Sequence, residues 1–384
     1  MATVLQTMTL DAKSYLCINI HIEFVYSNTM TRRRKVVSTI GSGMIALSAG
    51  CIGGDTSEEE SDNMDSEEVS AAIIYNGPID APGYTKVHHD AIDQIDSNND
   101  WVNIDYNELV DPSESNTVIE NLARQKDILF ANSVSYLDPM SSAAEDFPNT
   151  NFCVVDALDT SENLAGYNVR YVDGFFLTGQ AAGMVTESDL IGILSSFRVP
   201  LTYRWANAFA NGVNSVNEDA TILLRDMDVW FDPARAQSIT NSLVDEGVDV
   251  MSQHTDSPSP VQTASDNDIW SVGLYDEFAE FGGEKYLSSV MPNWAPYYKG
   301  QLQNVREGSW SSSTDWLGFE DESLSLDTFG SQVPSEVTNM IEENRQQIVD
   351  DELDVWQGTQ WEEQGDNLET IWQMSEFVDN IEAN

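Results

Sequence analysis

The sequence predicts an α/β protein built from two similar lobes, each with a parallel β-sheet. After residue 70, short apolar runs alternate with amphipathic stretches, and this alternation is typical of βαβ units. It occurs in two consecutive series, separated by the small-residue stretch 179–183. We therefore expect one lobe over about 71–188, a second over about 189–290, and a remainder that crosses between them, with a ligand cleft between the lobes.

Each series contains four predicted strands with helical segments between them. Apolar runs bounded by turn residues indicate the strands, and helical periodicity indicates the helices. The expected strands are 71–75, 102–106, 128–131 and 152–155 in the first series, and 191–194, 220–224, 248–252 and 269–274 in the second. The expected helices are 117–124, 205–216, 233–244 and an acidic helix over 337–348, followed by a tail that packs back on the lobes or stays partly free.

The helix over 233–244 has clear end signals. Asp232 can accept hydrogen bonds from the first free N–H groups of the helix, and Pro233 suits the first helical position. Gly247 lies just after the last turn, where a residue with left-handed backbone, usually glycine, commonly ends a helix.

The N-terminal 50 residues predict an export signal. Arg33 and Arg34 precede a short apolar run, as in a twin-arginine signal, and the sequence Leu-Ser-Ala-Gly-Cys over 47–51 is typical of a lipobox. The run falls short of the roughly 20 residues that a membrane-spanning helix needs. We expect translation to start at Met30 and Cys51 to be lipidated, which anchors the mature protein on the extracytoplasmic face of the membrane. Residues 51–70, which are almost wholly acidic or small, predict a disordered tether.

The charge is strongly negative. Asp and Glu number 65 against 17 Lys and Arg, giving a formal net charge of -48. Such repulsion is screened at molar salt, so a salt-loving host is expected, and nucleic acid is excluded as a direct partner. Hydrophobic residues still make up 41% of the chain, enough to form a core. With Cys51 lipidated, Cys153 is the one cysteine left in the mature chain, so neither a disulfide framework nor a thiolate metal site is expected.

Polar and aromatic residues gather where the predicted strands end, which is where open α/β sheets bind ligands. Aromatic faces with carboxylates beside them suit a planar ligand that has N–H or hydroxyl donors. In so acidic a chain, a single strand-end Asp is also explained as a helix cap or a solvated charge. The strand-end residues are Asp80, Tyr84, Trp230, Phe231, Asp232, His254, Thr255, Asp256, Tyr275, Asp276, Asn293 and Trp294.

The patterns of metal sites and of common enzymes are not met. The segment 96–100 begins like a calcium loop, but Trp101 and Asn107 replace the glycine and glutamate that such a loop requires. The sequence has no nucleophile elbow, no phosphate-binding Gly-Lys-Ser/Thr loop and no Cys-x-x-Cys pair. We expect no metal, no cofactor and no enzymatic activity.

Five short motifs, in order along the chain, resemble the basic membrane protein (BMP) family of ABC-transporter substrate-binding lipoproteins. The likeness extends from about Ala71 to about Asp351, over nearly the whole predicted mature domain. The motifs are FLTGQAAG at 176–183, NAFANG at 207–212, WFDP at 230–233, QHTDS at 253–257 and NWAPYY at 293–298.

The resemblance implies a type I periplasmic-binding-protein fold, in which two Rossmann-like lobes close on a ligand by hinge motion. It implies a small-molecule ligand, a purine nucleoside or related base, and an ABC permease and ATPase as partners. By motif, Tyr84 and either Trp230 or Phe231 would stack on the base. Trp294 would line the cleft. Polar edges would be held by Asp80, Asp173, Asp256, Asp276 and Asn293.

The first loop and the late strand depart from the nucleoside receptors of this family. The chain reads Asp80-Ala81-Pro82-Gly83-Tyr84 where they tend to have Asp-x-x-Phe-Asn, and Asn293-Trp294 where they tend to have a lysine. These departures weaken ribose recognition and leave a free base or another small solute open. Two other functions also stay open: a ligand sensor for a signalling partner, and an exported nucleoside-cleaving enzyme. Permease and ATPase genes beside this one would favour transport, and release of free base would indicate the enzyme.

Overall fold

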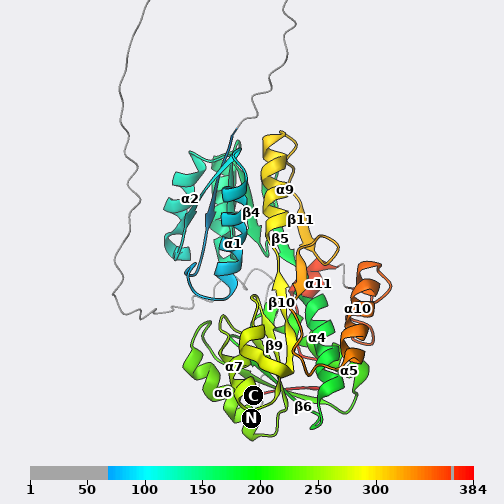
Figure 1. Ribbon diagram of the computed structural model, residues 1–384. Helices are drawn as coiled ribbons and strands as arrows, with labels where there is room; N and C mark the ends of the chain where they lie inside the picture. Colours follow the sequence, from blue (N-terminus) through cyan, green and yellow to red (C-terminus); the bar gives the residue numbers. More distant parts are fainter. Residues whose placement is uncertain (1–67, 365–366) are drawn as a thin grey trace, which may run out of the picture. The chain divides into compact units, whose positions relative to one another are not determined.

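The computed structural model describes residues 68–364 and 367–384, which form two β-sheets flanked by helices (Figure 1). The predictions for Met30, the twin-arginine signal, Cys51 and nearly all of the tether lie outside the described residues. Among the residues that the structure describes, no helix has the length and apolar character needed to cross a bilayer.

The first sheet has six parallel strands in the order β11-β5-β4-β3-β1-β2. Its central strands are buried on both faces, as expected for a parallel sheet covered by helices. The strands are β1 (Val69–Ile74), β2 (Val102–Asn107), β3 (Ile128–Ala131), β4 (Asn151–Val155), β5 (Leu164–Val169) and β11 (Thr314–Leu317).

The second sheet has seven strands in the order β12-β10-β9-β8-β6-β7-β13. All neighbours are parallel except β10 and β12. The strands are β6 (Leu190–Ser195), β7 (Thr221–Asp226), β8 (Val250–His254), β9 (Trp270–Leu274), β10 (Tyr286–Pro292), β12 (Leu324–Leu326) and β13 (Ile381–Ala383).

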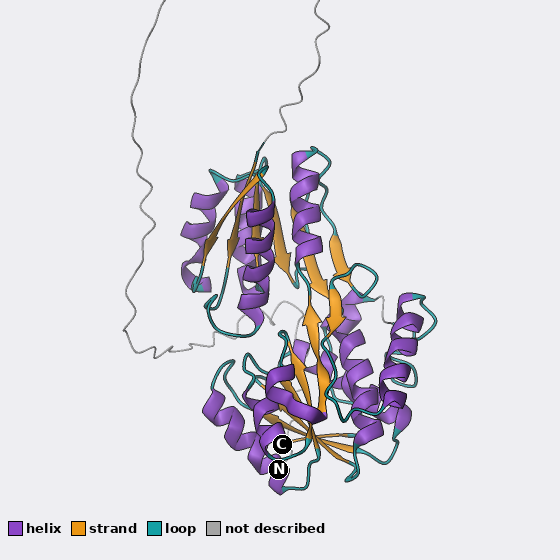
Figure 2. Ribbon diagram, viewed as in Figure 1, coloured by secondary structure: helices purple, strands orange, loops and turns teal. Residues whose placement is uncertain are grey.

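Helices follow most of the strands and cover the sheets (Figure 2). The helices packed with the first sheet are α1 (Tyr84–Asn98), α2 (Ser115–Ala123), α3 (Leu137–Asp146) and α9 (Ala295–Arg306). Those packed with the second are α4 (Tyr171–Val185), α5 (Pro200–Val216), α6 (Pro233–Asp245), α7 (Ser259–Asp266), α8 (Ala279–Gly282), α10 (Ser335–Val349) and α11 (Leu368–Trp372). Short 3-10 turns occupy Pro112–Glu114, Val134–Tyr136 and Gly283–Lys285.

The described chain passes between the two sheets three times. It leaves the first sheet after β5, returns after β10, and leaves again between β11 and β12. Three such connections can form a hinge. A few residues in each connection can absorb the backbone rotation while the two sheets move as rigid bodies. We refer to them as the first, second and third crossings, at residues 170–171, 293–294 and 318–323.

Most predicted elements are confirmed. All eight expected strands are present with end shifts of a few residues, and Asp232 accepts a hydrogen bond from the Arg235 N–H (3.0 Å) at the start of α6. Gly247 has φ 102°, the left-handed conformation expected after that helix. Strands β5, β10, β11, β12 and β13 were not predicted. Each has Gly, Ser, Asn, Asp or Glu among its apolar residues and so lacks the uninterrupted apolar run that indicated most of the other strands.

Two of the five family motifs form a close helix pair. Gly179 of α4 lies against α5, so a Cβ atom there would be 2.1 Å from the carbonyl oxygen of Phe209. Gly212 of α5 lies against α4 in the same way, 2.0 Å from the Phe176 carbonyl oxygen. Nearly every residue of α4 is buried, so these glycines set how closely the two central helices approach.

We expect Gly179→Ala to lower the free energy of unfolding by about 2–3 kcal/mol, because the new methyl group overlaps backbone that cannot move easily. Gly300→Ala is the matched control. Gly300 also lies in a helix, α9, but nothing lies within 4 Å of its Cβ position, so alanine there should stabilise by about 0.5–1 kcal/mol. Urea titration in molar KCl measures both, and equal stabilities would contradict the packing argument.

Candidate functional site

Residues from both sheets meet at the carboxyl ends of their strands. The Tyr84 N–H, at the start of α1, donates to Asp256 Oδ1 (3.2 Å), which follows β8. Gly83 precedes this contact with φ 121°, and a Cβ atom there would lie 2.8 Å from that of Asp256. The loop before α1 therefore needs glycine to approach the second sheet so closely, and the structure has the two lobes in contact.

Aromatic rings run without interruption from one lobe to the other, and we call this series the aromatic chain. The contact between Tyr84 and Tyr275 joins its two halves. The successive pairs, with their centroid separations, are Phe197–Trp230 (5.0 Å), Trp230–His254 (6.0 Å), His254–Tyr275 (6.2 Å), Tyr275–Tyr84 (5.4 Å), Tyr84–His88 (4.6 Å) and His88–Trp294 (4.3 Å). Such faces offer large apolar area to a planar ligand at a small cost in side-chain entropy.

Several buried polar atoms in and beside the aromatic chain have no hydrogen-bond partner within the described part of the protein. They belong to residues of α1, α4, α5 and β8 and to the residue that precedes α9, so they come from both lobes. Buried polar groups are rarely left unpaired, so a group of them around one site calls for an explanation such as a ligand. The atoms are His88 Nε2, Tyr171 Oη, Trp205 Nε1, His254 Nδ1 and Trp294 Nε1.

The histidines and tyrosines of the site are neutral. Burial lowers the pKa of His254 to about 3, with the Arg204 charge adding to the effect, and burial lowers the pKa of His88 as well. Burial also raises the pKa values of Tyr84 and Tyr275, and the nearby carboxylates add to the rise. The site therefore presents neutral donors and acceptors, which suit hydrogen bonding to an uncharged solute.

Two carboxyl groups lie among these rings. Burial raises the pKa of Asp256 to about 6, against the lowering effect of the Tyr84 N–H. Asp156 follows β4, and its charge adds to the rise that burial causes in the pKa values of Tyr84, Tyr171 and Tyr275. Asp156 and Tyr275 both have left-handed backbone, with φ 60° and 75°. Such strain at strand ends is common where side chains are aimed at a ligand.

Trp230 is held in place by the loops around it. The Asp256 N–H donates to the Trp230 carbonyl oxygen (3.3 Å), and Ser196 Oγ donates to the same oxygen (3.4 Å). Phe231, the alternative stacking residue, has 41% of its surface exposed. The geometry therefore favours Trp230 over Phe231 as the ring that would stack on a ligand.

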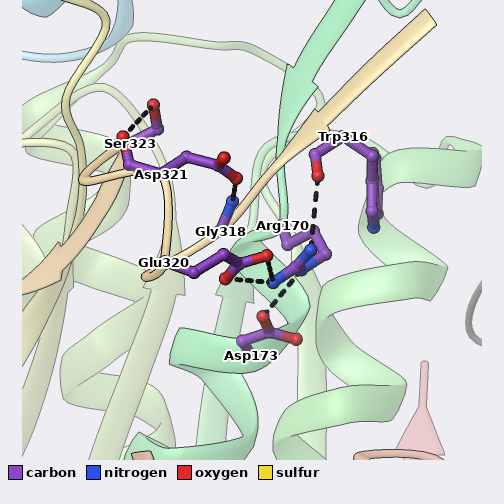
Figure 3. A network of polar contacts seen from close by, with 7 residues as sticks. All are labelled: Arg170, Asp173, Trp316, Gly318, Glu320, Asp321 and Ser323. Carbon is purple, nitrogen blue, oxygen red and sulfur yellow. Dashed lines mark hydrogen bonds and ion pairs between the residues drawn. The ribbon is translucent and has the colours of Figure 1, made fainter. Parts of the chain in front are cut away.

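Asp173 lies in the first turn of α4, directly after the first crossing, and takes part in an ionic network (Figure 3). Its carboxylate accepts from Arg170 Nε (3.0 Å), and Arg170 Nη2 also donates to both oxygens of Glu320 (2.5 and 2.6 Å) in the third crossing. Arg170 Nη1 donates to the carbonyl oxygen of Trp316 in β11, just before the third crossing. Burial raises the pKa of Asp173 to about 6, while the Arg170 charge opposes the rise.

Asn293 lies in the second crossing and binds the third. Its N–H donates to the Ser323 carbonyl oxygen (2.8 Å), and its Nδ2 donates to that of Glu322 (2.9 Å). Its Oδ1 accepts from the Ala295 N–H in the first turn of α9. The structure thus gives Asn293 and Asp173 hinge contacts, and their roles in ligand binding stay predictions.

The other predicted residues divide into two groups. Trp294 is fully buried, stacks on His88 and meets Tyr167 edge to face (5.6 Å). Asp80 is exposed in the loop after β1, and Asp276 Oδ1 accepts from the N–H of the next residue (2.9 Å). The structure therefore brings Tyr84, Trp230, Asp256 and Trp294 together through the aromatic chain, while Asp80 lies in the exposed part of its loop.

Comparison with known proteins supplies the family. The family described as ABC transporter substrate-binding protein PnrA-like matches residues 68–358. The chain belongs to this family. It is 36% identical to a putative ABC transporter glucose-binding protein of Haloferax volcanii, over 92% of this chain and 97% of that one. It is 27% identical to a purine-binding protein of Brucella abortus, over 82% and 93% of the two chains.

The fold agrees with solved structures of solute-binding proteins. An ABC transporter solute-binding protein from Conexibacter woesei superposes with TM-score 0.62 at 18% identity, over 74% of this chain and 98% of that one. The expected BMP family and type I fold are therefore confirmed. The PnrA-like protein is a solute-binding protein of an ABC transporter, a class that works outside the cytoplasm.

Four residues of the site, His88, Asp156, Tyr171 and Trp205, were not predicted from the sequence. Asp156 directly follows a predicted strand, so the strand-end rule that selected Asp256 would have found it. His88 and Trp205 lie within helices and Tyr171 begins one, so no strand end points to them. His254 and Tyr275 were noted as strand-end residues, and the structure shows them in the aromatic chain.

We expect Asp256→Asn to stabilise the PnrA-like protein at neutral pH and not at acid pH. The pKa of Asp256 rises from 3.8 to about 6 on folding, so the folded protein holds a proton between these values that the unfolded chain releases. The free energy of unfolding of the wild type therefore falls as the pH rises from 4 to 6. Asparagine keeps the acceptor for the Tyr84 N–H without the charge.

The stability gain of Asp256→Asn over wild type should be near zero at pH 4 and about 1–3 kcal/mol at pH 7.5. Urea titration at both pH values measures it. Asp228→Asn is the control, because the Asp228 side chain is 73% exposed and has no burial penalty to relieve. A gain for Asp256→Asn that does not change with pH would contradict the assignment.

Proposed function

We propose that the protein is a lipid-anchored receptor that binds a purine base or nucleoside between its lobes and delivers it to an ABC permease and ATPase. The observation that carries the proposal is the aromatic chain with its unpartnered buried polar atoms. Anchoring through Cys51 rests on the lipobox sequence. The receptor itself would change no covalent bond, and ligand would act by shifting the lobes toward the closed state.

The chemistry of a purine matches the site in three respects. Its planar ring has two faces for stacking, and Tyr84, Tyr275 and Trp230 are the rings that lie at the junction of the lobes. Its N–H groups are donors for a carboxylate such as Asp256, and its ring nitrogens are acceptors for the indole N–H groups of Trp205 and Trp294. The purine-binding relative from Brucella abortus supports the same class of ligand.

A sugar is the second candidate. The Haloferax volcanii relative, at 36% identity, carries the description of a putative glucose-binding protein. Sugars also place a flat face on aromatic rings and give hydroxyl protons to carboxylates. A purine offers a larger area for stacking than glucose does. Glucose, in turn, has more hydroxyl groups and so needs more hydrogen-bond acceptors around it.

We expect adenine or adenosine to bind and glucose not to bind, measured by isothermal titration calorimetry in molar KCl at pH 7.5. Asp256→Asn should weaken purine binding about 10-fold to 100-fold, because a hydrogen bond from the ligand to a carboxylate becomes one to a neutral amide. Wild-type affinity should fall as the pH drops below about 6, where Asp256 becomes protonated.

The control for this experiment is Asp228→Asn, an exposed carboxylate in the loop before α6, which should leave the affinity unchanged. Binding of glucose alone would replace the purine assignment with a sugar. Binding of purine with no effect of Asp256→Asn would keep the ligand class and remove Asp256 from the site. Incubation with adenosine should release no adenine, since release would indicate an enzyme.

A further inference from the structure

The C-terminal segment, residues 353–384 without 365–366, extends beyond the part of the chain that the family matches. The match ends at residue 358, whereas the segment continues to β13, which adds a parallel strand beside β7 in the second sheet. Its apolar side chains are buried, among them Trp356, Ile371 and Met374. The sequence left open whether this tail packs on the lobes, and the structure shows that it does (Figure 1).

Two asparagines of α5 hold the segment on the second lobe. Asn211 Nδ2 donates to the carbonyl oxygens of Val355 (2.8 Å) and Gln357 (3.2 Å). Asn207 Nδ2 donates to that of Glu376 (2.9 Å), and Asn207 Oδ1 accepts from the Val378 N–H (3.0 Å). Both asparagines belong to the NAFANG motif and are four residues apart, so they face the same side of the helix.

Trp372, at the end of α11, reaches from this anchored segment to the first sheet. Its Nε1 donates to Asp156 Oδ1 (2.5 Å), at the carboxyl end of β4. Its ring meets that of Trp316 in β11 edge to face (4.8 Å). Arg204 of α5 lies over the Trp372 ring (5.3 Å), and its Nη2 also donates to Asp156 Oδ1 (3.2 Å). A carboxylate of the first lobe is thus bound by two groups from elements of the second.

We propose that the C-terminal segment is a clasp that stabilises the contact between the lobes, with Trp372 as the positioning residue that holds Asp156. Opening of the cleft must separate α11 and α5 from β4, because these elements belong to different lobes. The Trp372–Asp156 contact shares no residue with the Tyr84–Asp256 contact, which joins α1 to the loop after β8. The proposal does not depend on which solute is bound.

The test is Trp372→Phe in the full chain, without ligand, in molar KCl, followed by amide hydrogen exchange. Phenylalanine keeps an aromatic ring but removes the N–H that donates to Asp156. The readout is the peptide that contains Tyr84, whose N–H is bonded across the lobes to Asp256 and has no direct contact with the segment. We expect its exchange to accelerate about tenfold to a hundredfold, as for the loss of one hydrogen bond to a charged group.

Trp361→Phe is the matched control, since Trp361 is a buried tryptophan of the same segment that packs against Trp356. It should leave exchange at Tyr84 unchanged. Equal acceleration in both variants, or none in Trp372→Phe, would overturn the clasp and leave the segment a structural cover. If Trp372→Phe does not fold, Asp156→Asn weakens the same hydrogen bond from the other side and is read in the same way. Because ligand is absent throughout, a failure of purine binding does not affect the outcome.

Discussion

Arg170 joins two of the three passages between the sheets. Its guanidinium binds Asp173 in α4, directly after the first crossing, Glu320 in the third crossing, and the carbonyl oxygen of Trp316 in β11, just before the third crossing. Burial alone would lower the pKa of Arg170, but the two carboxylates outweigh it and raise that pKa. A fixed fork of donors with charged partners keeps these passages in register, so rotation of the lobes is the motion left available.

The proposed ligand would stabilise several groups around the aromatic chain. Burial disfavours the charged form of the Asp256 carboxyl group. In addition, five polar atoms around the aromatic chain lack hydrogen-bond partners among the described residues. Each such group costs free energy in the closed form and less in an open form that admits water. A solute that forms hydrogen bonds with these groups would therefore bind the closed form more tightly than the open form. Such a difference in affinity shifts the equilibrium toward the closed form.

The strands and their order in the chain could be predicted because their signals are local. Apolar runs at regular intervals gave eight strands, and capping residues gave the bounds of α6. The contacts at the crossings could not, because they join residues far apart in the chain. Asn293 binds Glu322, 29 positions away, and Arg170, the partner of Asp173, binds Glu320, 150 positions away. The same holds for Asp156, whose partner Trp372 lies 216 residues further along the chain.

The family motifs illustrate why a resemblance identifies a fold more readily than a site. FLTGQAAG and NAFANG were recognised as motifs of solute receptors. In the structure their glycines set the approach of α4 and α5, and the asparagines of the second hold the C-terminal segment. Tyr84, Trp230 and Trp294, in contrast, meet through rings contributed by both lobes. Contacts with residues outside a motif thus decide whether a motif residue packs two elements together or joins the aromatic chain.

The charges beside the cleft restrict the solute further than the aromatic rings do. The arginines that contact cleft and hinge residues are both bound by carboxylates, Arg204 by Asp156 and Arg170 by Asp173 and Glu320. A phosphorylated solute at the proposed site would therefore meet Asp256 and would compete with Asp156 for Arg204. Salt screens the long-range repulsion that comes from a net charge of -48, but it does not screen charges a few ångströms apart in a closed cleft. The proposed site would accordingly favour neutral solutes with N–H or O–H donors, such as a base or nucleoside, over the corresponding nucleotides.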